Sequence, residues 1–134
     1  MIGGRVLDVT ALTAYATGRI YARALVGAAQ RSGALALAVP AAALLAARGQ
    51  LSEPARAELT ELVDFAPIVV DELTANTAVR AGDLLARARR RPPGDATAVA
   101  QVALSTRARA WPVVTSEPDA LLALDAALKI DVLP

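Results

Sequence analysis

Acidic side chains stand at places in this chain where secondary structure is predicted to begin or end. Asp8 ends a short apolar stretch, Asp95 opens a helical stretch, and Glu117 and Asp119 follow another short apolar stretch. In an open parallel sheet, ligands bind beyond the carboxyl ends of the strands, near the point where the strand order reverses. If the apolar stretches are parallel strands of one sheet, we expect these acids to meet in one pocket.

Carboxylates gathered in one pocket repel one another. The repulsion between two carboxylates about 4 Å apart costs roughly 4 kcal/mol at an effective dielectric constant near 20. This cost is a large part of a total free energy of unfolding on the order of 5–15 kcal/mol. Such a group becomes protonated, pairs with arginine or holds a cation. Oxygen ligands alone favour Mg²⁺ or Mn²⁺, and such an ion activates a water and stabilises charge on a phosphodiester.

Each acid also has a purely structural interpretation. Asp95 after Gly94 is a favourable N-cap, and Ser116 with Asp119 has the spacing of a capping box, with Asp in place of Glu. Asp8 is harder to explain in this way, because a carboxylate in an apolar strand context is costly unless it is paired or coordinated. The residues themselves leave both interpretations open.

The composition excludes several kinds of chemistry. The 134 residues include no cysteine and no histidine, which excludes disulfides, thiolate metal sites and histidine-based catalysis. The net charge of +1 creates no global field that would favour a polyanion. Asp8 interrupts what would be the apolar part of a signal peptide, and the longest apolar run, 34–47, is too short for a membrane span. We therefore expect a cytoplasmic protein without membrane association.

Strand-like and helical stretches alternate along the chain. Short apolar runs predict strands at 5–9, 34–39, 68–70, 112–115 and 130–133. Apolar spacing, caps and stop signals predict helices at 10–18, 19–31, 40–48, 52–65, 74–90, 95–109 and 118–127. This alternation favours a single α/β domain over residues 1–134, a three-layer α/β/α fold with a central, mostly parallel sheet of about five strands.

Two stretches of the chain resemble PIN domains, the family of metal-dependent ribonucleases that includes the VapC-type toxins of bacteria. RVLDVTALTAYATG contains Asp8 and Thr10, which match the Asp that ends the first strand of the family and the Ser or Thr two residues later. GDATAVAQVALSTRARAWPVVTSEPDALLAL contains Asp95 at a helix start and Thr115–Glu117 at a strand end, where the family usually has Thr-x-Asp or Thr-x-Asn. Asp119 matches a frequent additional acid. The order of the predicted strands and helices agrees with that of the PIN-domain family along nearly the whole chain.

The resemblance implies a metal-dependent endoribonuclease of the kind found in toxin–antitoxin pairs. The implied metal ligands, which bind Mg²⁺ or Mn²⁺ and carry the catalysis, are Asp8, Asp95 and Glu117, with Asp119 as a further ligand. The implied supporting residues, which hold carboxylates or waters in place, are Thr10, Thr115 and Ser116. The implied contacts to RNA phosphates are Arg87, Arg89, Arg90 and Arg91, although arginines at a helix C-terminus are commonly just solvated. The implied partners are RNA, an antitoxin-like protein and a second copy of the chain in a homodimer.

One family position differs in this chain. The family places a Glu on the helix after the second strand, a few residues past a Val-Pro like the one at 39–40, and here about Ala46 stands there. The acids that could take the place of this glutamate by approaching from elsewhere in the fold are Glu61, Asp64 and Asp83. The alternative is therefore a degenerate PIN domain, catalytically weak or inactive, that binds protein or RNA through its apolar helices at 11–29 and 41–47.

Overall fold

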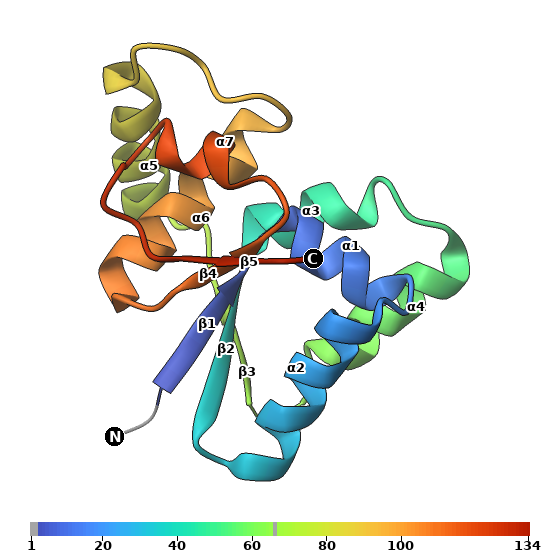
Figure 1. The fold of residues 1–134 in the computed structure, drawn as a ribbon. Coiled ribbons are helices and arrows are strands. Elements are labelled where there is room, and N and C mark those ends of the chain that lie inside the picture. Colours follow the sequence, from blue (N-terminus) through green and yellow to red (C-terminus); the bar gives the residue numbers. More distant parts are fainter. Residues whose placement is uncertain (1–2, 66) are drawn as a thin grey trace.

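The structure, a computed structural model, describes residues 3–65 and 67–134. Its strands form one five-stranded sheet in the order β3-β2-β1-β4-β5, and every pairing is parallel (Figure 1). The strands are β1 (Gly3–Leu7), β2 (Leu35–Pro40), β3 (Ile68–Asp71), β4 (Val113–Thr115) and β5 (Ile130–Val132). Met1, Ile2 and Ala66, which belong to the predicted domain 1–134, lie outside the described residues.

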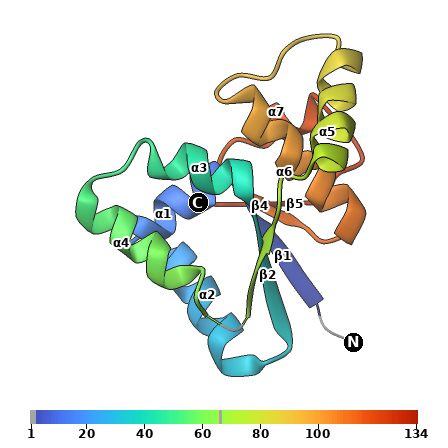
Figure 2. The same cartoon turned by 180° about the vertical axis from the view of Figure 1, so that it is seen from behind.

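Helices cover both faces of the sheet. They are α1 (Val9–Ala16), α2 (Ile20–Ser32), α3 (Ala41–Arg48), α4 (Glu53–Leu62), α5 (Ala75–Arg87), α6 (Ala96–Arg109) and α7 (Pro118–Leu122). Figures 1 and 2 show α1, α2 and α4 on one side of the sheet and α5, α6 and α7 on the other. α3 packs against both α1 and α6. The predicted three-layer α/β/α fold is confirmed.

The central strand β1 pairs with β4 and so positions the predicted site residues at the ends of both strands. Val6 pairs with Val113 and Leu7 pairs with Val114, and all four side chains are buried. Strands covered on both faces read as continuous apolar runs rather than as alternating patterns, which is why the sequence shows them clearly. Asp8, which follows β1, and Ser116 and Glu117, which follow β4, therefore emerge side by side at the carboxyl edge of the sheet.

Gln101 joins three elements inside the molecule. Its side chain, on α6, is fully buried. Its Oε1 accepts a hydrogen bond from the backbone N–H of Ala42 at 2.7 Å, and its Nε2 donates one to the carbonyl of Asp71 at 2.9 Å. The N-cap of α3 is Pro40, which offers no side-chain acceptor. Gln101 therefore satisfies one of the N–H groups that a helix start leaves without an intrahelical partner.

A close contact on β1 depends on glycine. A Cβ atom added to Gly4 would lie 2.4 Å from ring atoms of Trp111. The guanidinium carbon of Arg109 lies over the same indole ring, 4.9 Å from the ring centre. Arg109 is also held by Asp71, through Nε at 3.1 Å and Nη2 at 2.5 Å. The ring of Trp111 thus packs against the backbone of β1 and lies near an arginine that is paired with Asp71.

Several helices end earlier than the sequence predicts. α5 ends at Arg87, so Arg89–Arg91 lie in the loop before α6 instead of on the helix. Arginines one helical turn apart repel one another, and Pro92 disfavours a helical conformation at the residue before it. α4 and α7 are shorter as well, ending at Leu62 and Leu122.

We expect Gly4→Ala to lower the free energy of unfolding by about 1–3 kcal/mol, the usual range for overpacking, because the new methyl group would meet the ring of Trp111. Chemical denaturation measures this change. Gly3→Ala is the matched control, since a Cβ atom at Gly3 has no neighbour within 4 Å. Equal stability of the two variants would contradict the contact.

We expect Gln101→Leu to lower the free energy of unfolding by about 2–4 kcal/mol, because it leaves the N–H of Ala42 and the carbonyl of Asp71 without their buried partner. Gln30→Leu, at an exposed position on α2, is the control. If both variants unfold at the same denaturant concentration, Gln101 does not join these elements.

Candidate functional site

The strand order reverses between β1 and β4. From β1 the chain adds β2 and then β3 on one side, and later returns to place β4 and β5 on the other side. The crevice at such a point is where open parallel sheets bind their ligands. Asp8 directly follows β1 and Glu117 lies two residues after β4, so both acids stand at this crevice.

A cavity of about 150 Å³ lies at the switch point, and its wall includes Asp8, Asp95 and Glu117. These predicted acids come from three distant parts of the chain, after β1, before α6 and after β4. The remaining wall residues are Val9, Thr10, Gln50, Pro93, Gly94, Val99, Val102, Ala120 and Leu121. The fold therefore brings these acids to the wall of one common cavity.

Asp8 is both the N-cap of α1 and a buried wall residue. Its Oδ1 accepts hydrogen bonds from the backbone N–H of Ala11 at 2.9 Å and from the hydroxyl of Thr10 at 2.6 Å. The residue is only 8% exposed. Burial raises the pKa of Asp8, although the hydroxyls of Thr10 and Thr115 and nearby N–H groups act to lower it. The charged form is therefore held at a cost that the hydrogen bonds do not fully offset.

The predicted supporting hydroxyls connect the two turns at the carboxyl edge. Thr10 donates to Asp8 and also accepts a hydrogen bond from the backbone N–H of Ser116 at 2.9 Å. The hydroxyl of Thr115, fully buried, accepts one from the backbone N–H of Glu117 at 2.9 Å. The turn after β1 and the turn after β4 are thus linked through side chains that surround Asp8.

Asp95 repeats the local arrangement of Asp8 in a more exposed place. It is the predicted N-cap of α6, and its Oδ1 accepts from the backbone N–H of Ala98 at 3.1 Å and from the hydroxyl of Thr97 at 2.6 Å. The hydrogen bond from Thr97 is the main reason why the pKa of Asp95 is lowered. Both sites have the pattern Asp-x-Thr, a signal in the sequence that could have identified Thr97.

The predicted capping box at the start of α7 is wrong. The N-cap is Glu117 rather than Ser116, and no side chain caps the helix. Pro118 occupies the first turn and has no N–H to be capped, so the helix start needs fewer acceptors. Asp119 lies in the wall of a different hollow, together with Arg90. The structure therefore separates Asp119 from the cavity that the other predicted acids share.

The acids around the cavity do not form a compact metal site. Within residues 3–65 and 67–134, no group of three or more acidic side chains is arranged closely enough to hold a metal ion. The cavity wall contains neither Ala46 nor any of Glu61, Asp64 and Asp83 as possible replacements for the family glutamate, judged on these same residues. Gln50, just beyond α3, contributes an amide there instead. Sequence reasoning missed Gln50, because nothing in its local pattern shows that it lines the same cavity as Asp8.

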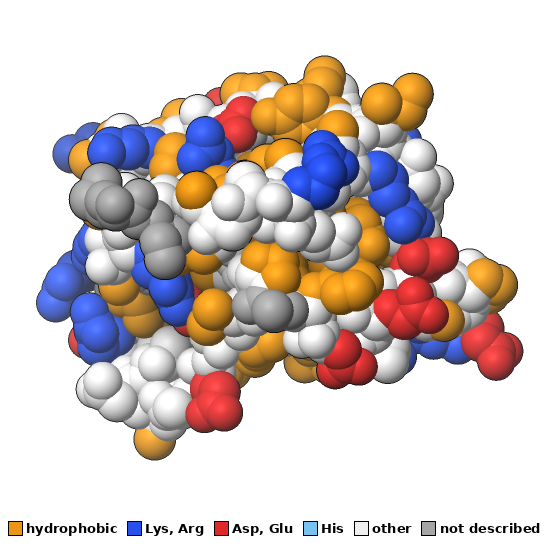
Figure 3. Space-filling view, turned by 90° about the horizontal axis from the view of Figure 1, so that it is seen from below, with side chains coloured by type: hydrophobic (Ala, Val, Ile, Leu, Met, Phe, Trp, Pro, Cys, Tyr) orange, Lys and Arg blue, Asp and Glu red, His pale blue; other side chains and the backbone are white. Residues whose placement is uncertain are grey.

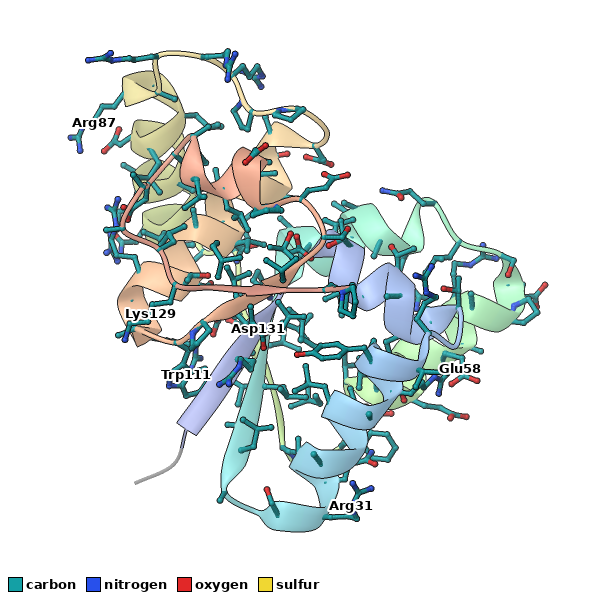
Figure 4. The ribbon with its side chains drawn as sticks, in the orientation of Figure 1. Arg31, Glu58, Arg87, Trp111, Lys129 and Asp131 are labelled. Atoms are coloured by element: carbon teal, nitrogen blue, oxygen red, sulfur yellow. The ribbon has the colours of Figure 1, made fainter. Side chains whose placement is uncertain are left out.

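The predicted arginines lie beside the cavity rather than in it. Arg90 and Arg91 line a hollow of about 420 Å³ that includes Pro93, and Pro93 also belongs to the wall of the acidic cavity. Arg87 and Arg89 line a further hollow of about 470 Å³ together with Arg90. Figure 4 shows Arg87 pointing outward from the end of α5. The arginines and the acids are thus on neighbouring parts of the surface.

No family model matches this chain, and no curated protein is similar enough to be matched with it. Membership of the PIN-domain family therefore stays a prediction from the short motifs and the order of elements. Within the part of the chain that the structure describes, no helix has the length and apolar character needed to cross a membrane.

We expect Asp8→Asn to raise the free energy of unfolding at pH 7. Because burial raises the pKa of Asp8 in the folded protein, its ionisation opposes folding, and this penalty disappears as the pH falls below the pKa of the unfolded chain. Asparagine can still accept the hydrogen bonds from Thr10 and Ala11. Chemical denaturation at several pH values should show that the difference in the free energy of unfolding between Asp8→Asn and the parent shrinks towards acidic pH.

Asp95→Asn is the matched control, for which we expect the opposite change in the free energy of unfolding. The pKa of Asp95 is lowered in the folded protein, so its charge contributes stability above the pKa of the unfolded chain, and that contribution is lost as the pH falls through the folded value. Asp95→Asn should therefore reduce the free energy of unfolding at pH 7. Changes of the same sign in the two variants would contradict the different environments.

Proposed function

We propose that this protein is a PIN-like endoribonuclease, of the kind found in bacterial toxin–antitoxin pairs, that cleaves RNA phosphodiesters with Mg²⁺ or Mn²⁺. The observation that supports this best is the common cavity of Asp8, Asp95 and Glu117 at the switch point of a parallel sheet. Carboxylate oxygens are the ligands that these ions prefer. The proposed function uses no histidine or cysteine, and the chain has neither.

In this proposal, the acids at the cavity and the threonines that position them have defined tasks. A bound divalent ion supplies an activated water and stabilises charge on the phosphate. Asp8 provides a buried carboxylate whose direction is fixed by Thr10 and Ala11. Asp95 and Glu117 provide further carboxylates in the cavity wall, and the hydroxyl of Thr115 accepts a hydrogen bond from the backbone N–H of Glu117. A cation also relieves the cost of keeping Asp8 charged, since opposite charge favours the ionised form.

The substrate in this proposal is RNA held by its phosphates. Arg89, Arg90 and Arg91 lie in the loop that leads to Asp95, so their charges lie next to the acidic cavity. No aromatic residue within 3–65 and 67–134 lines the cavity or the hollows next to it, so stacking on bases contributes little. Recognition then depends on the phosphate backbone rather than on base sequence.

The proposal includes the cytoplasm as the location and an antitoxin-like protein or a second copy of the chain as partner. Large apolar side chains are exposed on the helices that would take part: Ile20 on α2 is 87% exposed and Leu45 on α3 is 75% exposed. Figure 3 shows further apolar side chains between separate groups of basic and acidic ones on the face seen from below. A partner that covers such side chains gains hydrophobic stabilisation.

A degenerate PIN domain that binds protein or RNA without cleavage is the second candidate. It is favoured by Ala46 at about the position of the family glutamate and by the lack of a compact acidic group within the described residues. Loss of one carboxylate weakens cation binding and also relieves repulsion, which suits a domain that no longer catalyses.

Thermal denaturation with Mn²⁺ tests the two candidates. At an Mn²⁺ concentration about tenfold above its Kd, the nuclease proposal predicts a rise of roughly 2–5 °C in melting temperature. Asp8→Asn should abolish this rise, whereas Asp83→Asn, on the exposed face of α5, should preserve it. The parent protein should also cleave single-stranded RNA in Mn²⁺, and Asp8→Asn should not.

The binding-module candidate predicts a different result with metal. Millimolar Mn²⁺ leaves the melting temperature of the parent unchanged, and the parent does not cleave single-stranded RNA. Those two results would overturn the nuclease proposal, whereas a stabilising effect of Asp8→Asn without metal is expected for both candidates.

A further inference from the structure

A hollow of about 470 Å³ lies where the end of α5 and the residues after it meet α6 and the turn after α7. Its wall, within the described residues, consists of two kinds of side chain only, arginines and apolar ones. The apolar residues are three leucines and three alanines, and the arginines are Arg87, Arg89, Arg90 and Arg107. We call it the basic hollow.

The positive charge of the basic hollow is compensated only in part. Arg107 pairs through Nε with a carboxylate oxygen of Asp125 at 2.9 Å. Arg87 lies in the last turn of α5, where its charge offsets the partial negative charge of the helix C-terminus. Arg89 and Arg90 lie beyond the helix, and no carboxylate of residues 3–65 and 67–134 is within salt-bridge distance of either. An anionic ligand would therefore find two guanidinium groups without a counter-charge.

The leucines of the same wall indicate which kind of anion fits. Leu84 is buried, whereas Leu122 and Leu124 are half-buried and so still offer apolar surface. Such surface is stabilised when aliphatic groups of a ligand cover it. The bases of a nucleic acid stack instead on aromatic side chains, and no aromatic residue of the described chain lines the basic hollow. A peptide that carries both acidic and aliphatic side chains therefore fits the hollow better than a nucleic acid strand does.

We propose that the basic hollow is a docking site for an acidic segment of a partner protein. Carboxylates of the segment pair with Arg89 and Arg90, and an aliphatic side chain between them covers Leu122 and Leu124. Groups of arginines recognise acidic motifs in many complexes, and a guanidinium gives up its water more readily than an ammonium does. Exposed ion pairs are weak one by one and are screened by salt, so the complex needs the apolar contact as well as the charges.

A segment docked in the basic hollow competes with RNA, a step that rests on the proposed function. Arg90 lines both the basic hollow and the hollow that shares Pro93 with the acidic cavity. A carboxylate paired with Arg90 therefore removes one of the proposed contacts to RNA phosphates. The second of these hollows also contains Asp119, which disfavours a further carboxylate there. The partner thus weakens RNA binding without entering the acidic cavity.

A fluorescein-labelled peptide made of Glu-Glu-Leu repeats is the first probe, with its binding to the full chain followed by fluorescence anisotropy in EDTA. We expect saturable binding that weakens as salt is added. The double variant Arg89→Gln/Arg90→Gln should raise the Kd roughly tenfold, because two ion pairs are lost. Leu122→Ser should raise it about threefold through the lost apolar contact. Arg31→Gln, exposed at the end of α2 and far from Arg87 (Figure 4), is the matched control and should bind as the parent does.

A Glu-Glu-Ser peptide and a short oligouridylate are the probes that separate the possible occupants. The serine peptide keeps the charges but lacks the aliphatic side chains, so it should bind at least about threefold more weakly than the leucine peptide. The inference is overturned if the two peptides bind equally, if the double arginine variant binds as the Arg31→Gln control does, or if oligouridylate binds through Arg89 and Arg90 while the leucine peptide does not bind.

Competition and metal binding are measured separately from peptide binding. The leucine peptide should raise the apparent Kd of oligouridylate, because both ligands use Arg90. A protein that responds to Mn²⁺ and cleaves RNA but does not bind the leucine peptide refutes the basic hollow alone. A protein that binds the leucine peptide through Arg89 and Arg90 but ignores Mn²⁺ and leaves RNA intact supports the basic hollow and refutes the nuclease proposal alone.

Discussion

The pairing of β1 with β4 is the constraint on which the rest of the structure depends. Val6 lies opposite Val113 and Leu7 opposite Val114. This register fixes the height at which both strands end, so Asp8 and Thr115 leave the sheet together. A shift of β4 by one residue would move each of its side chains to the other face. It would also break the hydrogen bond between Thr10 and the backbone of Ser116.

The two N-cap aspartates show how position in the fold changes the meaning of a local pattern. Asp8 and Asp95 each accept from the N–H three residues later and from a threonine hydroxyl two residues later. Burial nevertheless raises the pKa of Asp8, while hydrogen bonding lowers that of Asp95. Capping explains Asp95 without any ligand. It explains Asp8 only in part, because a less buried cap would give the same hydrogen bonds at a lower cost.

The sequence predicts the elements well where a signal is local. The strand predicted at 112–115 is found at Val113–Thr115, because Val113 and Val114 are apolar on both faces of the sheet. Asp95 is found as a helix N-cap, because it follows Gly94 and precedes a helical stretch. The contacts of Gln101 were not predicted, because both of its hydrogen bonds reach residues at least 30 positions away. A buried glutamine on a helix looks like any polar helical residue until the fold is known.

The candidate site was predicted in part for the same reason. Asp8, Asp95 and Glu117 each follow a strand or open a helix, and the rule for parallel sheets then places them together. Asp119 lines a different hollow, together with Arg90, and nothing in the local sequence around α7 indicates this. The C-terminal end of α5 was misjudged because charge repulsion and a proline outweighed the helix propensity of arginine and alanine.

The open arrangement of the acids bears on how a metal would bind. Asp8 is buried, but Asp95 and Glu117 are exposed, so water screens their repulsion when no cation is present. A cation then gains less from this site than from a compact group of carboxylates. Mg²⁺ is commonly held by one or two carboxylates together with phosphate oxygens of the substrate. In the proposed function, metal and RNA would therefore bind cooperatively, each supplying part of what the other lacks. Phosphate contacts at the loop that holds Arg89–Arg91 would then matter for the metal as well, because they bring the missing oxygen ligands to Asp8.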